Sequence, residues 1–227
     1  MEKLKNNIAA FFSKAGIRAD FLTVLGLFFA FISGALIYQG MFFWAGAAVL
    51  LSGFLDLMDG AVARLSTTAN GFGGVLDSSL DRYGDGFIFA GLILFCARHD
   101  SRLYALLAVS AWLGSFLISY VRARAECVIP KCRVGFWERG ERIIYVALGL
   151  LLNNVALVLW VLALATHATA LFRLAYCKKE TEDPGYWERH PAQVSDIFFQ
   201  RQGRAGGAYF FKIMALFLAV FLIRMSL

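Results

Sequence analysis

Apolar residues in this chain form long blocks, each about the length of a membrane-crossing helix. A helix that crosses the hydrocarbon core needs about 20 mainly apolar residues. The last block is too long for one crossing and is divided by Asn153 and Asn154, which suit a tight turn at an interface. We therefore predict an all-α integral membrane fold, a bundle of six transmembrane helices. The predicted spans cover residues 21–38, 42–63, 73–97, 103–125, 141–153 and 155–176.

Segments at both ends of this bundle have a different pattern. Residues 1–18 are charged and amphipathic, which predicts an N-terminal helix lying on the membrane surface, with a disordered tail as the alternative. Residues 177–206 are polar and predict a cytoplasmic loop. Residues 207–227 turn apolar again and predict a further helix, either a seventh span or an interfacial helix. The predicted domains are a membrane domain over 1–176, the polar loop over 177–206 and the C-terminal helix over 207–227.

The composition agrees with a membrane location. Hydrophobic residues make up 59% of the 227 residues and charged residues 17%, whereas soluble domains have about 45–50% and about 25%. The lipid bilayer is therefore an expected partner. The net charge of +6 is scattered between apolar spans without a basic stripe, so nucleic-acid binding is not expected. The four cysteines lack the spacing of a zinc site.

Lysine and arginine gather in alternate connections between the predicted spans. They lie before the first span, at Arg64 after the second, between the fourth and fifth, and at Lys178 and Lys179 after the sixth. The opposite connections carry few or none. The positive-inside rule then places both ends of the six-helix unit in the cytoplasm, as in a multi-pass protein of the cell membrane.

Four aspartates lie within the second and third predicted spans, where a charge costs about 2.5–3.5 kcal/mol near a helix centre. Asp56 and Asp59 are three residues apart, and Asp77 and Asp81 are four apart, so each pair shares a helix face. Two carboxylate pairs on adjacent antiparallel helices form a site for Mg²⁺ or Mn²⁺, with two ions expected.

The residues around these acids suit a phosphate group. Gly60 and Gly73 remove side chains, so that the backbone can approach a bulky phosphate closely. Arg64 is placed to bind a phosphate oxygen. An acid-lined cation transporter is the alternative from another functional class. Small residues, an arginine and clustered acids together favour phosphoryl chemistry.

The acidic segments resemble the signature of the CDP-alcohol phosphotransferases. That signature is DxxDGxxAR, a spacer of eight or nine residues, and GxxxDxxxD. Here DLMDGAVAR begins at Asp56, and GGVLDSSLD begins at Gly73 after eight residues, so every signature position is matched. The resemblance implies in-line transfer of a phosphatidyl group from a CDP-linked lipid to an alcohol, with release of CMP. It also implies a homodimer, and the charge placement described above predicts that the active site faces the cytoplasm.

The resemblance also implies a role for each matched residue. Three aspartates would be metal ligands, and the last would bind metal and act as the base for the acceptor hydroxyl. The metal set is Asp56, Asp59, Asp77 and Asp81; the CDP-lipid set is Gly60, Ala63, Arg64 and Gly73, with Asp20 and Thr23 as nucleotide contacts. The donor would be CDP-diacylglycerol or a CDP-linked ether lipid.

A second polar cluster bears on the acceptor. Arg122, Arg124, Arg142 and Arg173 lie near ends of the fourth, fifth and sixth spans. They could bind a dianionic phosphate, or they could be ordinary positive-inside residues that extend to lipid headgroups. The segments SYVRARAE and ERGER resemble bacterial phosphatidylinositol-phosphate synthases and archaeal archaetidylinositol-phosphate synthases. That resemblance implies a phosphorylated alcohol, inositol 1-phosphate, as acceptor; glycerol 3-phosphate, the acceptor of a phosphatidylglycerophosphate synthase, is second.

Overall fold

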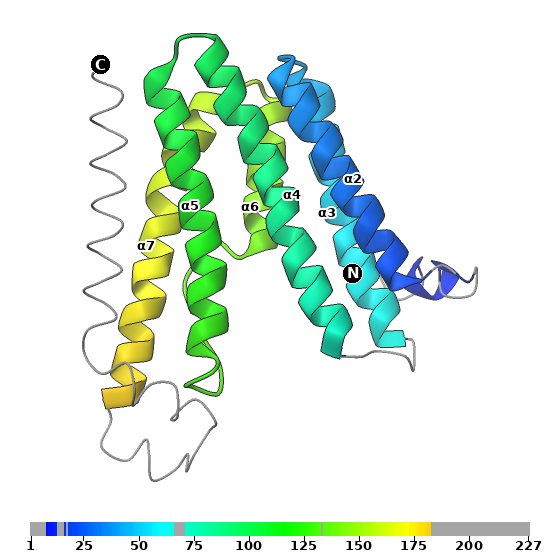
Figure 1. The fold of residues 1–227 in the computed structure, drawn as a ribbon, viewed down its shortest axis with the longest axis vertical. Coiled ribbons are helices and arrows are strands. Elements are labelled where there is room, and N and C mark those ends of the chain that lie inside the picture. Colours follow the sequence, from blue (N-terminus) through cyan, green and yellow to red (C-terminus); the bar gives the residue numbers. More distant parts are fainter. Residues whose placement is uncertain (1–7, 13–15, 17, 66–70, 133, 183–227) are drawn as a thin grey trace. The chain divides into compact units, whose positions relative to one another are not determined.

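The computed structural model describes residues 8–12, 16, 18–65, 71–132 and 134–182. All regular secondary structure in this part of the chain is helical (Figure 1), which confirms the predicted all-α class. The predicted polar loop lies outside the described residues except for its first six positions, and the predicted C-terminal helix lies wholly outside them.

Six long helices coincide with the six predicted spans. They are α2 (Ala19–Tyr38), α3 (Phe42–Leu65), α4 (Gly71–Arg98), α5 (Arg102–Ala125), α6 (Arg139–Leu151) and α7 (Val155–Glu182). The main difference is that α7 continues to Glu182 instead of ending at residue 176. Its last turn carries an i,i+4 pair, Lys178 Nζ to Glu182 Oε1 at 3.6 Å, a spacing that supports helix in a polar segment.

The predicted turn at the paired asparagines is present between α6 and α7. Asn153 has φ 53°, a left-handed conformation that asparagine adopts more readily than most residues. The Asn154 side-chain oxygen accepts a hydrogen bond from the Leu157 N–H at 3.3 Å, as an N-cap residue does. One asparagine thus closes α6 and the next opens α7.

Four of the described helices, α2, α3, α5 and α7, are long and apolar enough to cross a membrane. On α2, Phe21, Phe28 and Phe31 are each more than half exposed, as expected of side chains that face lipid. Helix α4 has several charged residues in its first half, and α6 has 13 residues, about 20 Å of helix. The count of six crossings stays a prediction for these two helices.

The chain divides into two compact units, one formed by Met1–Arg122 with Arg133–Ala175 and the other by Ala123–Cys132 with Tyr176–Leu227. In the first unit, α2 packs against α3 and α4, and α3 packs against α6. The α2–α4 contact depends on glycine, because a Cβ at Gly34 would clash with the Phe87 backbone and one at Gly91 with the Gly34 backbone. These close contacts hold α4 against α2.

Two apolar clusters support the first unit. The larger includes Ile37, Val49 and Leu92 from three different helices. The smaller lies beneath the end of α3 that carries the aspartates, where Leu22 of α2 and Met58 of α3 are almost completely buried. Part of the N-terminal segment, residues 8–12, is helical and packs on this smaller cluster.

The second unit contains the end of α5 and the turn that follows it. The backbone N–H groups of Val128 and Ile129 both donate to the Ala125 carbonyl at 2.8 Å. The Cys132 N–H donates to a Glu126 carboxylate oxygen at 3.4 Å. These bonds fold the chain back directly after α5.

Candidate active site

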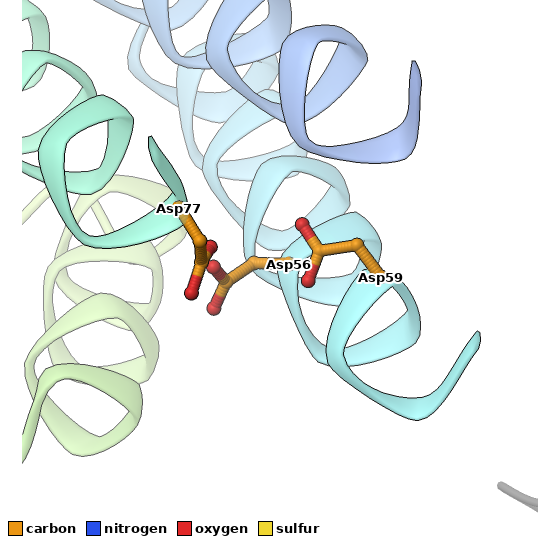
Figure 2. A group of neighbouring side chains, drawn as sticks. All are labelled: Asp56, Asp59 and Asp77. Atoms are coloured by element: carbon orange, nitrogen blue, oxygen red, sulfur yellow. The ribbon is translucent and has the colours of Figure 1, made fainter. Parts of the chain in front are cut away.

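Three of the four predicted aspartates form a compact group on α3 and α4. Asp56 and Asp59 come from α3 and Asp77 from α4, and their side chains turn toward one another (Figure 2). One carboxylate oxygen from each lies within 4.8 Å of the other two. The i,i+3 spacing on α3 puts its two acids on one face, and packing between helices brings Asp77 to the same place.

The burial of this group fits a divalent cation. Asp59 is 4% exposed. Within the described residues, Asp59 Oδ2 and Asp77 Oδ1 are buried and have no hydrogen-bond partner, a costly arrangement for carboxylate oxygens. Mg²⁺ and Mn²⁺ prefer oxygen ligands of this kind. The residues present therefore fit such an ion.

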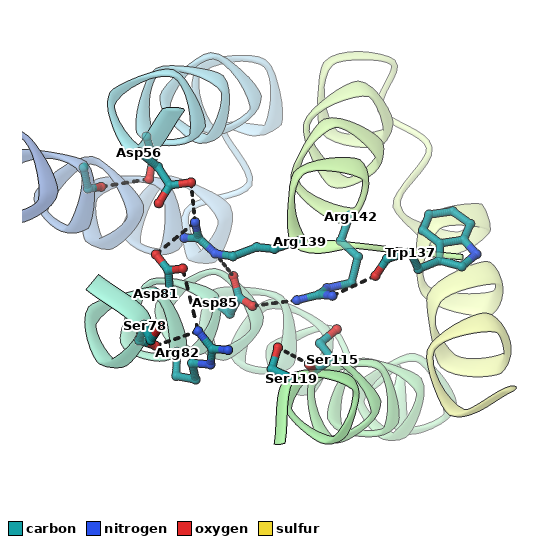
Figure 3. A network of polar contacts seen from close by, with 12 residues as sticks. Asp56, Ser78, Asp81, Arg82, Asp85, Ser115, Ser119, Trp137, Arg139 and Arg142 are labelled. Atoms are coloured by element: carbon teal, nitrogen blue, oxygen red, sulfur yellow. Dashed lines mark hydrogen bonds and ion pairs between the residues drawn. The ribbon is translucent and has the colours of Figure 1, made fainter. Parts of the chain in front are cut away.

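The fourth predicted aspartate, Asp81, lies beside this group and contacts arginine. Arg139, the first residue of α6, places Nη1 2.9 Å from Asp81 Oδ1 and 2.7 Å from Asp56 Oδ2 (Figure 3). Asp81 Oδ2 also lies 3.7 Å from Arg82 Nη1. One guanidinium thus joins a carboxylate of α3 to a carboxylate of α4.

Local bonds at the start of α6 determine where Arg139 lies. The Glu141 carboxylate accepts hydrogen bonds from the backbone N–H groups of Trp137 at 2.8 Å and Glu138 at 3.1 Å. This reciprocal capping begins the helix at Arg139. Arg139 was not among the predicted site residues, although its position in the ERGER segment was a signal that could have identified it.

A fifth aspartate, Asp85, extends the network beyond the signature. Its Oδ1 lies 3.6 Å from Arg139 Nε, and its Oδ2 accepts a hydrogen bond from Arg142 Nη2 at 3.4 Å. Arg142 also donates through Nη1 to the Trp137 carbonyl at 2.9 Å. Sequence reasoning missed Asp85; its signal was the i+4 spacing from Asp81.

A small polar cleft opens onto these groups. Its lining includes Thr23 of α2, Asp56 and Asp59 of α3, Asp81 of α4 and Arg139 of α6. Four helices thus supply the walls, and polar side chains from each of them meet there. Thr23 is the one predicted nucleotide contact that lines this cleft.

The remaining predicted donor-site residues flank the aspartates along the chain. Gly60, Ala63 and Arg64 follow Asp59 on the last turns of α3, and Gly73 is near the start of α4. Arg64 is exposed at the end of its helix. Asp20, in the first turn of α2, is exposed and pairs with Arg18 at 3.2 Å.

The four predicted acceptor arginines have different surroundings. Arg142 belongs to the aspartate network, and Arg122 Nη1 lies 3.7 Å from a carboxylate oxygen of Glu138, the residue before Arg139. Arg173 is 2% exposed and donates to the carbonyls of Val134 and Ile118, both at 2.9 Å. Arg124 is part of the second unit.

Comparison with known proteins gives a family match and similar solved structures. The family described as CDP-alcohol phosphatidyltransferase matches residues 17–172. A solved structure of phosphatidylinositol phosphate synthase from Mycobacterium tuberculosis, with CDP-DAG bound, superimposes with a TM-score of 0.71 at 30% identity, over 81% of this chain and 96% of that one. Another structure of that synthase, in complex with manganese and citrate, also gives a TM-score of 0.71.

Two curated relatives are also named as synthases of inositol phosphate lipids. The phosphatidylinositol phosphate synthase of Mycobacteroides abscessus is 33% identical over 181 residues, which cover 76% of this chain and 82% of the relative. The archaetidylinositol phosphate synthase of Methanothermobacter thermautotrophicus is 40% identical over 136 residues, which cover 60% of this chain and 67% of the relative.

Proposed function

Because the chain belongs to the CDP-alcohol phosphatidyltransferase family, we propose that it uses Mg²⁺ or Mn²⁺ to transfer a phosphatidyl group from a CDP-linked lipid to inositol 1-phosphate, releasing CMP. The observation that carries the proposal is the carboxylate group of Asp56, Asp59 and Asp77 within 4.8 Å. It lies inside the family signature and within a multi-pass membrane protein.

Asp56, Asp59 and Asp77 would hold the metal, with Asp81 completing the set for a second ion. An ion held by these carboxylates would neutralise charge on the pyrophosphate and on the departing CMP. Manganese in a structure of the Mycobacterium tuberculosis synthase supports the choice of metal. The two oxygens of Asp59 and Asp77 that lack a partner in the described residues support the ligand set.

Asp81 would serve as the general base. Its Oδ1 is held by Arg139 at 2.9 Å, and its side chain lines the polar cleft beside the metal ligands. The acceptor oxygen attacks the phosphorus that carries the lipid, its proton passes to Asp81, and the bond from that phosphorus to the CMP oxygen breaks. A carboxylate held in position is suited to accept that proton.

The donor would bind along the end of α3 and the start of α4. Gly60, Ala63, Arg64 and Gly73 would line the CDP portion, with Asp20 and Thr23 contacting the nucleotide. CDP-DAG in a structure of the Mycobacterium tuberculosis synthase supports a CDP-linked lipid as donor. The relative from Methanothermobacter thermautotrophicus is named for an archaetidyl product, so an ether-lipid donor is to be assayed alongside CDP-diacylglycerol.

The acceptor would be recognised by its phosphate. Arg142 lies in the same network as Asp81, joined through Arg139 and Asp85, so a phosphate bound there would place its alcohol close to the base. Arg122 and Arg173, which belong to the same unit as Arg142, complete the proposed acceptor set, and Arg124 stays a prediction from the sequence. The names of both curated relatives support inositol 1-phosphate over glycerol 3-phosphate.

The assay is CMP release from CDP-diacylglycerol by the purified full-length chain in detergent micelles with Mg²⁺. Inositol 1-phosphate, glycerol 3-phosphate, free inositol and buffer alone are the acceptor arms. The proposal predicts release with inositol 1-phosphate far above the other three. CMP release with glycerol 3-phosphate alone would identify that compound as the acceptor instead. No CMP release in any arm would leave an acid-lined transporter as the better interpretation.

We propose further that the site faces the cytoplasm of the cell membrane and that the enzyme is a homodimer. The arrangement of lysine and arginine along the chain supports the orientation, and the family supports the dimer. A membrane-impermeant thiol reagent applied to intact cells should leave the exposed Cys127 unlabelled. Light scattering of the protein–detergent complex should give twice the 25.2 kDa chain mass.

A further inference from the structure

Asp85 is a carboxylate of the active-site network that lies outside the family signature, which ends at Asp81. It is one helical turn beyond Asp81 on α4, and its side chain is 16% exposed. Its two oxygens contact different arginines, Oδ1 toward Arg139 Nε at 3.6 Å and Oδ2 toward Arg142 Nη2 at 3.4 Å (Figure 3). Its place is therefore between two cations.

These two arginines need an anion between them. Arg139 and Arg142 are three residues apart, on one face of α6, and their side chains are 20% and 5% exposed. Two guanidinium groups that share a poorly solvated site repel each other, and burial makes that repulsion stronger than in water. A carboxylate that contacts both groups offsets the repulsion and fixes their orientation.

The bonds of the two arginines also link the metal ligands to the proposed acceptor site. Arg139 contacts Asp56 and Asp81, whereas Arg142 contacts Asp85 and the Trp137 carbonyl. A dianionic phosphate bound by Arg142 would therefore lie beside the Arg139 guanidinium, which contacts the proposed base Asp81. Asp85 is the group that holds both arginines at that spacing.

We propose that Asp85 is a positioning residue for the phosphate of the acceptor: it aligns Arg139 and Arg142 without binding the metal or the CDP-lipid. The proposal rests on the proposed function, because it assumes that Arg142 binds a phosphorylated acceptor. The role of Asp85 extends the proposed function, because it assigns the specificity for a phosphorylated alcohol partly to a carboxylate that touches neither substrate.

The test separates three quantities in the full-length enzyme: the KM for inositol 1-phosphate, the KM for CDP-diacylglycerol, and the Kd for Mn²⁺ measured by electron paramagnetic resonance. Asp85→Asn keeps the shape and removes the charge. It should raise the acceptor KM about tenfold or more, by analogy with the loss seen when a group that orients a metal ligand is removed. The donor KM and the Mn²⁺ affinity should stay unchanged. The acceptor KM of Asp85→Glu should lie between that of Asp85→Asn and that of wild type.

Asp100→Asn is the matched control. It makes the same chemical change at an exposed residue in the turn between α4 and α5, where φ is 51°, and asparagine tolerates that conformation. All three quantities should equal those of wild type. An unchanged acceptor KM in Asp85→Asn, or a parallel loss of Mn²⁺ affinity, would overturn the proposal.

A double-mutant cycle with Arg142→Gln gives a second measurement. If Asp85 acts through Arg142, Asp85→Asn should raise the acceptor KM much less in the Arg142→Gln background than in wild type. Equal effects in both backgrounds would contradict this route. If Asp85→Asn alone fails to fold, the same cycle is measured with Asp85→Glu, which keeps the charge and changes the geometry.

Failure of the proposed function gives a different pattern. If wild type neither binds Mn²⁺ nor releases CMP with any phosphorylated alcohol, the proposed function itself is wrong. If wild type does both and Asp85→Asn leaves the acceptor KM unchanged, only the role of Asp85 is wrong. Because the contact is to phosphate, the shift is also expected with glycerol 3-phosphate if the enzyme accepts it.

Discussion

Arg139 is expected to stabilise the fold as well as the site, because its guanidinium contacts three carboxylates, those of Asp56, Asp81 and Asp85. Its Nη1 lies 2.7 Å from Asp56 and 2.9 Å from Asp81. A unit charge pair at 4 Å is worth about 4 kcal/mol at an effective dielectric constant of 20. Removing one partner of a buried pair typically costs about 3–5 kcal/mol.

Arg139→Gln should therefore lower the free energy of unfolding by about 3 kcal/mol, since all three carboxylates are partly solvated and the loss lies at the low end. Arg139→Lys keeps the charge and loses the second donor group, so its loss should be smaller. The measurement is the unfolding of the detergent-solubilised protein in the presence of EDTA, monitored by tryptophan fluorescence. Adding Mn²⁺ should then stabilise Arg139→Gln more than wild type, because the ion offsets the unpaired carboxylates.

Lys178→Gln is the control for this prediction. Lys178 makes an exposed pair with Glu182, 73% and 66% exposed, and such pairs contribute little. Its unfolding curve should overlay that of wild type. If Arg139→Gln unfolds with the same midpoint as this control, the contacts of Arg139 contribute nothing to stability and the reasoning is refuted.

Two further predictions concern the aspartates and the buried arginine. Asp77→Asn or Asp81→Asn should abolish CMP release while the protein stays folded and inserted, checked by turnover and by membrane extraction; full activity in either variant would remove its assigned role. Arg173→Ala should raise the KM for inositol 1-phosphate and, because two charge-assisted hydrogen bonds to the carbonyls of Val134 and Ile118 are lost, should also lower stability by about 3 kcal/mol. An unchanged KM in that variant would leave Arg173 a structural residue only.

Helix positions were predictable from the sequence because each span is a self-contained apolar block. The turn at Asn153 and Asn154 was predictable for the same reason, since two polar residues in an apolar block have few places to lie. The end of α7 was misjudged because the pattern changes from apolar to polar at residue 177, whereas helix depends on local propensity and pairing as well. Lys178 and Glu182 support the extra turn.

The acidic site was predictable in part. Helical spacing puts Asp56 with Asp59, and short connections bring α3 and α4 together, so the meeting with Asp77 follows from the sequence. The contact of Asp81 with Arg139 does not follow, because the two residues are far apart in the chain and lie on different helices, α4 and α6. Such a contact is set by tertiary packing, which periodicity does not specify.

The acceptor arginines show the same limit. Spacing alone left phosphate binding and lipid-facing positions equally open for all four. The structure distinguishes Arg142, which joins the aspartate network, from Arg173, which donates to backbone carbonyls. The i+4 spacing from Asp81 puts Asp85 on the same helix face, but its role depends on which two arginines α6 places beside it, and the sequence does not specify that contact.

The central claim, that Asp56, Asp59 and Asp77 gather around a divalent ion, is tested most directly by Mn²⁺ binding to the purified chain, followed by electron paramagnetic resonance. We expect wild type to bind Mn²⁺, and added Mg²⁺ to displace the bound Mn²⁺. Asp59→Asn and Asp77→Asn should each lose most of the Mn²⁺ affinity, whereas Asp100→Asn should keep it. Wild-type binding that survives both substitutions would show that the ion lies elsewhere and that the carboxylate group is not the metal site.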